Sequence, residues 1–580
     1  MAQAVAFALL GAMCFAPVPA LELGANVDGV VDYSFTLALV DVVKQSRKWG
    51  SLRAPWDGNC SVGSDGWPAQ ADCGNVFVTL PAGLPSPTHG WPSAEGVWLV
   101  TFQGAADLVL DGMQGASVVN QSYSAATDTT TLSLVVPAPG PSSCNCIMLG
   151  FANASTVAGG PGLKALKILQ PGYTLSQAGD FSAPLLTLLQ RFSVLRFMDW
   201  ARTNGNLIED WANRTLPSSP SYAPDGQAVP WELIFALANL LGKDPWINVP
   251  AHASDDYVLQ LATLAKQLLD PGLNLYLEWS NEVWNWSFEQ SHYALQAAIA
   301  SVAAGDPYHL NASGLEGDGN PGYWHMRYYV AVSKAHGDIF EGVFGPGSVG
   351  KSARVRPVYA WQCGGDHEVG LAYFLRFYGE PSTFFHSLAC APYMTIGDAA
   401  EDPALTVEAV LAGWRSYQQN ISLAGPFGWG QENYVAGMAS TALYYGLNMQ
   451  AYESGPDTAQ GLNNYPALWA KGNASADPRI EAIIVDYLTA WHAYGPAMGP
   501  QNYFTLGAGP LDDKYGIYSV LQDMGVQSTP KLSAIDTALA TPVGVSPLIP
   551  TIPTILNASL FVGHKTPASP NGFNGWPGTL

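Results

Sequence analysis

Alternating strand and helix signals between Leu195 and Glu282 constrain the fold of this chain more than any other feature. "SVLRF" predicts a buried strand, and "WELIFALANLLG" predicts a helix from apolar residues at helical spacing, closed by Gly242. "WINVP" is the next strand, Ser254 caps a second helix that stops at Pro271, and "NLYLEWS" is the third strand. Links are short after each helix and longer after each strand, which is typical of a parallel sheet with function at its carboxyl edge.

Five further strand candidates bring the predicted total to eight: "LELGAN", "RVRPVYAWQ", "SLACAPYM", "LNMQAYE" and "NYFTL". An open doubly wound sheet would show the same local alternation, but eight strands favour closure into a barrel. The predicted fold class is therefore α/β, a (β/α)8 TIM barrel. Residues 21–49 are expected to form its first β/α unit and residues 166–530 the remainder.

The segments that interrupt and follow this alternation have a different character. Residues 50–165 contain period-two alternation in "GVWLVTFQGAADLVL" and "TTTLSLVVPAP", with turn residues between, which predicts an inserted β-sandwich. That insertion either lengthens the binding face of the barrel or is a carbohydrate-binding module. Residues 531–580 are rich in Pro, Ser and Thr without a period, so we expect an extended or loosely packed tail.

The N-terminus predicts export. An apolar run from Ala4 to Met13, followed by small residues at Val18 and Ala20, is typical of a signal peptide over residues 1–20. This run is too short to span a bilayer, and no later stretch is long enough, so no membrane anchor is expected. The protein is therefore predicted to be secreted, to the extracellular space or a cell wall.

Cysteines and glycosylation sequons agree with that compartment. Removal of the signal peptide leaves an even number of cysteines, which suits an oxidising environment, and the nearest pairs are Cys60 with Cys73 and Cys363 with Cys390. Sequence alone does not fix the pairing, and a direct bridge between Cys144 and Cys146 would be strained. Nine Asn-x-Ser/Thr sequons are glycosylation candidates: Asn59, Asn120, Asn153, Asn213, Asn285, Asn311, Asn420, Asn473 and Asn557.

Charge and motifs exclude several classes of function. A net charge of −22 repels phosphate backbones and anionic membranes, which argues against nucleic acid as a partner and leaves neutral or cationic ligands. "GPGSVGKS", residues 345–352, matches a phosphate-binding loop, but strand-like residues follow it where a helix is required. Zinc-hydrolase and serine-hydrolase signatures are absent from the sequence, so no metal or cofactor is expected.

Two glutamates at predicted strand ends carry the candidate chemistry. Glu282 follows a strand in "YLEWSNEVWNW", and Glu453 follows another in "NMQAYESGPD", so both are expected on the carboxyl rim of the barrel. Acetal hydrolysis needs a proton donor for the leaving oxygen and a nucleophile or base at the anomeric carbon. Two carboxyl groups in different electrical environments meet both needs. Glu278, on the same strand face as Glu282, is expected to be a buried, hydrogen-bonded carboxylate inside the barrel.

These residues resemble the clan of retaining (β/α)8 glycosidases that includes cellulases, mannanases and β-galactosidases, whose members carry Asn-Glu after strand four and Glu after strand seven. The resemblance implies an acid/base role for Glu282, a nucleophile role for Glu453 and a sugar contact for Asn281. It also matches Arg196 to an Arg on strand two and Tyr393 to a Tyr on strand six, both beside the nucleophile. The strand-eight Trp of the clan has no clear counterpart, and the chain also resembles a group described as cellulose-binding proteins.

Further polar and aromatic residues follow predicted strands and are candidate sugar contacts. Aromatic rings there can stack on pyranose rings, and core packing explains any single Trp equally well. His252 ends a strand and is as consistent with a structural role as with sugar binding. The candidates on this rim are His252, Asp199, Asn204, Trp200, Trp284 and Trp361, with Trp211 and Trp286 beside them.

The sequence thus predicts a secreted retaining glycoside hydrolase that cleaves β-linked polysaccharide of the glucan or mannan kind. A non-catalytic glycan-binding or coat protein of the same fold would have the same sequence pattern. A third class, an oligomeric structural glycoprotein, would use the Pro-rich tail as its contact. The sugar, the endo or exo mode of attack and the oligomeric state are left open.

Overall fold

The structure is a computed structural model that describes residues 21–541, apart from 80–94, 113–114, 138–145, 158–159, 177–178, 316, 364–366, 423–433, 460, 462 and 495–496. The predicted signal peptide, residues 542–580 of the predicted tail, Cys144 and the sequon at Asn557 lie outside the described residues.

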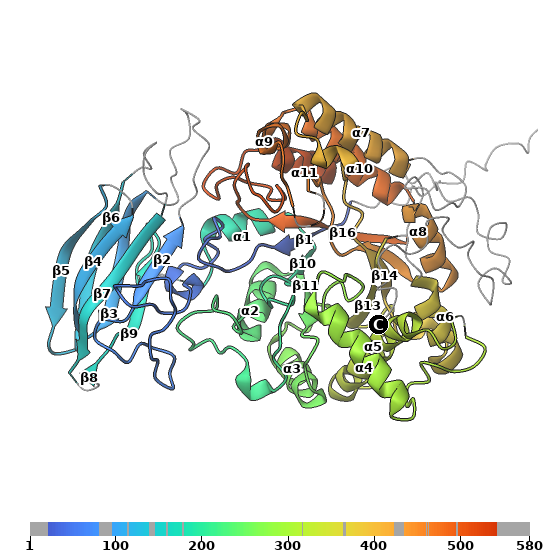
Figure 1. Cartoon of the computed structure of the whole chain (residues 1–580), viewed down its shortest axis with the longest axis horizontal. Helices are drawn as coiled ribbons and strands as arrows, with labels where there is room; N and C mark the ends of the chain where they lie inside the picture. Colours follow the sequence, from blue (N-terminus) through green and yellow to red (C-terminus); the bar gives the residue numbers. More distant parts are fainter. Residues whose placement is uncertain are drawn as a thin grey trace, which may run out of the picture.

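Eight parallel strands form a closed barrel, as the sequence predicted, and each of the eight strand candidates contributes one strand (Figure 1). The strands run in sequence order around the barrel. Each pairs with the barrel strand before it and the one after it in the sequence, and the last strand pairs with the first. They are β1 Leu23–Val27, β10 Val194–Arg196, β11 Asp244–Val249, β12 Leu275–Trp279, β13 Val355–Ala360, β14 Ser387–Cys390, β15 Asn448–Ala451 and β16 Met498–Leu506.

Local sequence signals set the ends of the two helices between Leu195 and Glu282. Helix α2, Trp231–Leu241, ends at Gly242, which has a φ of 66°, a left-handed conformation that costs Gly little. Helix α3, Asp255–Leu268, begins where the Ser254 hydroxyl accepts a hydrogen bond from the backbone N–H of Tyr257. Both helices bury one apolar face in the large core outside the barrel strands, which fixes the position of β11 between them.

The remaining helices pack around the barrel. They are α1 Ala183–Leu189, α4 Glu289–Ala303, α5 Pro321–Phe344, α6 His367–Tyr378, α7 Val407–Ser422, α8 Tyr434–Tyr444, α9 Leu468–Ala476, α10 Ile480–Ala493 and α11 Pro530–Ala540, with short 3-10 turns η1 Val42–Gln45, η2 Trp211–Asn213, η3 Pro381–Thr383 and η4 Gly397–Glu401. The expectation of a loose segment from residue 531 is wrong for its first part. Helix α11 buries Leu532 and Ile535 and packs against α10.

Residues between β1 and α1 carry a two-sheet β-sandwich with its own apolar core, on one side of the barrel (Figure 1). One sheet has the order β2-β7-β4, with β8 paired to β7, and the other has the order β5-β6-β3-β9. The strands are β2 Asn75–Thr79, β3 Gly96–Gln103, β4 Ala105–Gly112, β5 Ser117–Ser124, β6 Thr129–Val136, β7 Cys146–Thr156, β8 Gly160–Pro161 and β9 Lys164–Leu169.

The sandwich divides the first β/α unit, whereas the sequence analysis expected that unit to be complete by residue 49. Only the short turn η1 follows β1, and α1 comes after the sandwich. The last sandwich strand, β9, extends to Leu169 and is tied to the barrel loop. Ile168 N–H donates to the Asp41 carboxylate at 3.0 Å, and Gln170 N–H donates to the Val40 carbonyl at 3.1 Å.

Other sequence-based expectations can be checked in the fold. Disulfides join Cys60 to Cys73 and Cys363 to Cys390, which confirms both nearest-neighbour pairs. The "GPGSVGKS" segment begins at Gly345, where α5 ends, and leads into β13, so it does not open a helix. In the described ranges no helix combines the length and apolar character needed to cross a membrane.

Candidate active site

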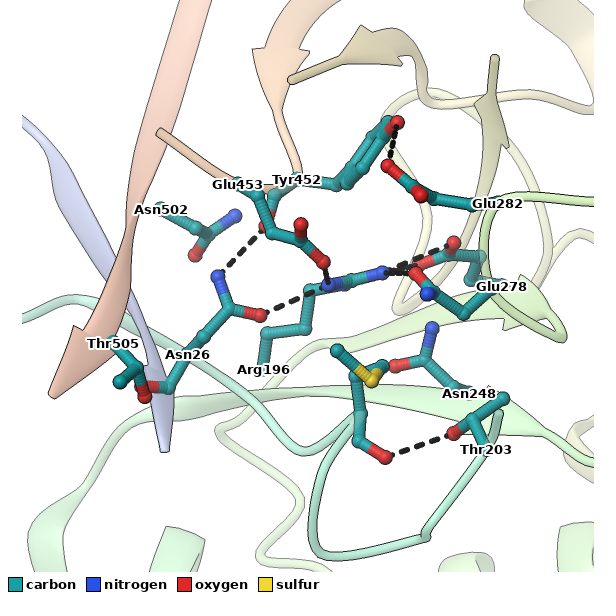
Figure 2. Close-up of polar contacts among 12 residues, drawn as sticks. Asn26, Arg196, Thr203, Asn248, Glu278, Glu282, Tyr452, Glu453, Asn502 and Thr505 are labelled. Atoms are coloured by element: carbon teal, nitrogen blue, oxygen red, sulfur yellow. Dashed lines mark hydrogen bonds and ion pairs between the residues drawn. The ribbon is translucent and has the colours of Figure 1, made fainter. Parts of the chain in front are cut away.

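Both candidate carboxyl groups lie at the carboxyl rim of the barrel. Glu282 lies three residues beyond the end of β12, and Glu453 lies two residues beyond the end of β15. Parallel barrel strands present their carboxyl ends on one face, so the two side chains reach the same rim. Figure 2 shows them in one group of polar contacts above Arg196, with Tyr452 beside both.

Glu453 is held by two donors, one on each carboxylate oxygen. Arg196 Nη1 donates to Oε1 at 2.7 Å, and the Tyr393 hydroxyl donates to Oε2 at 2.9 Å. The side chain is nearly buried, so solvent screens these contacts little. A buried carboxylate bonded to a guanidinium and a phenol is stabilised as an anion and has a fixed orientation.

Arg196 organises the floor of the site from β10, where its side chain is fully buried. Beyond Glu453 it donates to both Glu278 oxygens (3.1 and 3.2 Å), to Asn26 Oδ1 (2.9 Å) and to Asn281 Oδ1 (2.7 Å). Burial alone would lower the pKa of Arg196, but the carboxylates of Glu278 and Glu453 outweigh it and raise that pKa above its usual value. The guanidinium therefore stays charged and ties four strands together.

Glu278 is the buried, hydrogen-bonded carboxylate that the sequence predicted. Besides the Arg196 contacts, the Trp246 indole N–H donates to its Oε2 at 2.7 Å. Burial raises the pKa of Glu278 while Arg196 lowers it. Its exposed fraction is 1%, so it cannot reach a substrate and acts by holding Arg196.

Glu282 is in a different electrical environment. The Tyr452 hydroxyl donates to its Oε1 at 3.0 Å, and the Asn285 side-chain amide donates to its Oε2 at 2.9 Å. Burial, followed by the negative charge of Glu453, raises the pKa of Glu282 to about 7. The backbone φ of Glu282 is +41°, an uncommon conformation for a residue with a side chain, and its carbonyl accepts the N–H of Asn285. The carboxyl group of Glu282 thus has a pKa near neutrality, next to the Glu453 carboxylate that accepts from a guanidinium and a phenol.

Asn281 and Asn204 join the site through a short amide network. Asn281 Nδ2 donates to Asn204 Oδ1 at 3.0 Å, and Gln290 Nε2 donates to the same oxygen at 2.6 Å and to the Asn281 carbonyl at 2.8 Å. Asn281 is 2% exposed. Its place after β12 was predicted, and its contacts with Arg196 and with Gln290 from α4 were not.

Two other predicted contacts reach the same rim. The Trp284 indole N–H donates to the Tyr452 hydroxyl at 3.2 Å, which places this half-buried ring beside Glu282. Asp199 lies in the turn after β10. Burial raises the pKa of Asp199 to about 7, with smaller contributions from the charges of Asp28 and Glu453.

Three predicted sugar contacts are placed differently from the expectation. Trp200 is fully buried, packs on Phe181 and donates its indole N–H to the Asp28 carbonyl at 2.9 Å, so it belongs to the core. Trp361 is 4% exposed and packs among buried aromatic rings, which leaves almost no face for a sugar. His252 packs on Tyr293 with the rings tilted by 34° and contacts Glu289 at 3.1 Å, away from the Glu282 and Glu453 contacts.

Sequence reasoning missed Tyr452, which contacts Glu282, and several residues that contact the partners of the two glutamates. Tyr452, Asn26 and Gln290 carry no motif, although Tyr452 is adjacent to Glu453 and follows a strand. Tyr518, in the loop after β16, lies 5.7 Å from Tyr393 between ring centroids. Within the described parts of the chain, no group of three or more His, Cys, Asp and Glu side chains is arranged to hold a metal ion.

Comparisons with known proteins add little beyond the fold. No family model matches the sequence, and no curated protein matches it. Among solved structures, it is similar to a glycoside hydrolase family 5 mannosidase from Rhizomucor miehei, to a mutant of that enzyme and to a second mutant in complex with mannosyl-fructose. Identities are 10–11%, TM-scores are 0.26–0.28, and the alignments cover 61–62% of this chain and 85–87% of the others. Likenesses this low do not bear on substrate or residue roles, and the barrel is established by the strand order itself.

Proposed function

We propose that the protein is a secreted retaining glycoside hydrolase that cleaves β-linked polysaccharide. The observation that carries this proposal is the pair of carboxyl groups on one rim with opposed environments: Glu453 bonded to Arg196 and Tyr393, and Glu282 with its pKa raised to about 7. Such a pair supplies an anionic nucleophile and a protonated acid at the same pH.

The reaction proceeds by two displacements at the anomeric carbon. Glu453 attacks that carbon while Glu282 gives its proton to the leaving glycosidic oxygen, so a glycosyl ester forms on Glu453 and the aglycone departs. Ionised Glu282 then takes a proton from water, whose oxygen attacks the same carbon and releases Glu453. Formation of the ester removes the charge of Glu453 that had raised the pKa of Glu282, which favours the change of Glu282 from acid to base.

Exposed aromatic rings in the segments that follow the carboxyl ends of β15 and β16, with Trp469 in the first turn of α9, support a polymeric substrate. Tyr465 and Trp469, after β15, are 53% and 76% exposed, and Tyr515, after β16, is 58% exposed. The two loops are joined because Asn464 N–H donates to the Lys514 carbonyl at 2.8 Å. Aromatic faces stack on pyranose rings, so these residues extend the site beyond the cleaved bond.

A panel of soluble and insoluble β-glucans and β-mannans, assayed for reducing ends, tests the proposed activity. Glu282→Gln and Glu453→Gln should each lower the rate at least a hundredfold, the scale of general acid or nucleophile loss. Glu289→Gln is the matched control, because Glu289 follows the same loop but contacts His252. Glycan binding without sugar release by any of the proteins would instead support the non-catalytic alternative.

Binding to insoluble glycan tests the aromatic extension separately. Trp469→Ala and Tyr465→Ala should each weaken binding about tenfold and leave hydrolysis of a short soluble glycoside unchanged. Leu240→Ala, at an exposed position of α2 on the outside of the barrel, is the control. Equal binding by all three variants would remove these rings from the site.

A further inference from the structure

One of the predicted glycosylation sequons lies inside the candidate site. Asn285 begins the sequence Asn-Trp-Ser, and its side chain is half-buried. Among the sequons whose side chains the structure describes, the others are exposed: Asn59, Asn120, Asn153, Asn213, Asn311 and Asn473. The side chain of Asn420 and all of Asn557 lie outside the described residues. Asn285 therefore differs in burial from the other sequons whose side chains are described.

Both ends of the Asn285 side chain are engaged in the loop that carries Glu282. Nδ2 donates to Glu282 Oε2 at 2.9 Å, and Oδ1 accepts from the Ser287 backbone N–H at 3.0 Å. The second contact fixes which end of the amide faces Glu282, because only Oδ1 can accept from a backbone N–H. The Asn285 backbone N–H also donates to the Glu282 carbonyl at 2.8 Å. These contacts close a tight turn in which Glu282 has positive φ.

An N-linked glycan would attach at this same nitrogen. The modification replaces one of the two Nδ2 hydrogens with the anomeric carbon of a sugar, which places a pyranose within about two covalent bonds of the atom that contacts Glu282. Either the hydrogen bond to Glu282 is lost or the sugar enters the space beside the carboxyl group, where a leaving group must approach. Both outcomes oppose proton transfer from Glu282.

We infer that Asn285 is a positioning residue for Glu282 rather than a glycan carrier, and that any molecule glycosylated at Asn285 is inactive. This inference rests on the proposed function for its activity readout. The chain offers a clean separation of the two roles, because Ser287→Ala removes the sequon and leaves the amide, whereas Asn285→Ala removes both. Ser122→Ala, which removes the exposed sequon at Asn120, is the matched control.

The experiment uses the full chain secreted from a eukaryotic host. Occupancy of each sequon is measured by enzymatic deglycosylation in heavy-oxygen water and mass spectrometry. Asn285 should be unmodified in the active protein, and any fraction modified there should release no sugar. Ser287→Ala and Ser122→Ala should keep the wild-type rate. A glycan on Asn285 in fully active protein would overturn the inference.

Asn285→Ala tests the positioning role, with thermal unfolding as a check of folding. Loss of the hydrogen bond that positions the Glu282 carboxyl group predicts about a tenfold lower kcat. Since the Asn285 contact lowers the pKa of Glu282, its loss should also move the alkaline limb of the pH–rate profile to higher pH. A merely structural defect would lower the rate without moving the limb, so an unmoved limb would refute the role whether or not the rate falls.

Failure of the proposed function can be told apart from failure of this inference. If the wild-type protein releases sugar from no glycan, NMR of carboxyl-labelled glutamate still reports the titration of Glu282, assigned through Glu282→Gln. A higher pKa in Asn285→Ala than in the wild type then supports the contact, and an identical pKa contradicts it.

Discussion

Replacement of Arg196 by Met is the perturbation for which the structure gives the clearest magnitude. Met keeps an unbranched chain of similar length but removes the donors to Glu453, both oxygens of Glu278, Asn26 and Asn281. The side chains of Glu278 and Glu453 are only 1% and 8% exposed, so water does not replace the lost cation. Removing one partner from a buried ion pair costs about 3–5 kcal/mol of unfolding free energy.

The cost should depend on pH with a definite sign. Arg196 lowers the pKa of Glu278, so the variant has a higher Glu278 pKa in the folded state than the wild type. A carboxyl group whose pKa is higher in the folded than in the unfolded state contributes most to the free energy of unfolding below its unfolded pKa of about 4.3. That contribution to stability is lost as the pH rises through the folded pKa. The destabilisation by Arg196→Met should therefore be smallest near pH 4 and approach about 3–5 kcal/mol at pH 7.

Urea denaturation of both proteins between pH 4 and pH 8 measures this difference. Arg214→Met is the control, because Arg214 pairs with Glu232 at 2.8 Å at a more exposed position and should cost about 1 kcal/mol or less. Equal stability of Arg196→Met and the wild type at pH 7, or a loss that does not change with pH, would refute the account of the buried network.

Three further predictions concern other parts of the structure. Tyr452→Phe removes a donor that lowers the pKa of Glu282, so the alkaline limb of kcat/KM should shift upward by up to about one pH unit, and an unmoved limb would contradict the contact. Burial raises the pKa of Asp41 to about 6. Asp41 Oδ1 accepts hydrogen bonds from the backbone N–H groups of both Val43 and Ile168. Asp41→Asn can keep those contacts, so it should be neutral near pH 4 and stabilising by about 1–3 kcal/mol at pH 7, as judged by denaturation. Opening the Cys363–Cys390 disulfide, which spans 27 residues, should lower the free energy of unfolding by about 3.5 kcal/mol. Opening Cys60–Cys73, which lies in the segment before the β-sandwich strands, should lower it by about 3 kcal/mol and leave kcat unchanged, and a loss of kcat in that variant would contradict the prediction.

The sequence predicted those parts of the fold that depend on local signals. Gly242 and Ser254 mark helix ends through their own backbone or side chain, and the buried strands between such helices followed from their apolar runs. Glu282 and Glu453 could be placed on one rim because parallel strands in a barrel share their direction. A local signal was also overlooked at α11, where Thr529 caps the helix and Pro530 opens it.

Long-range packing decides what the sequence could not predict. Trp200 and Trp284 both follow strands, but only the barrel and its core determine that the first is covered and the second reaches the rim. The β9 strand extends beyond the predicted sandwich boundary at residue 165 because it pairs with β3, far away in the sequence. Tyr452 reaches Glu282 from three strands further along the barrel, a contact across 170 positions.

Rescue by azide tests the roles of the two glutamates most directly. On an activated aryl β-glycoside, Glu453→Ala with azide should release the α-glycosyl azide, because azide replaces the missing nucleophile in a single inversion. Under the same conditions Glu282→Ala should form the β-glycosyl azide through the ester on Glu453, and NMR of the products distinguishes the two anomers. The opposite assignment of anomers, or no rescue of either variant by azide when the wild type is active, would contradict the proposal that Glu453 attacks and Glu282 transfers the proton.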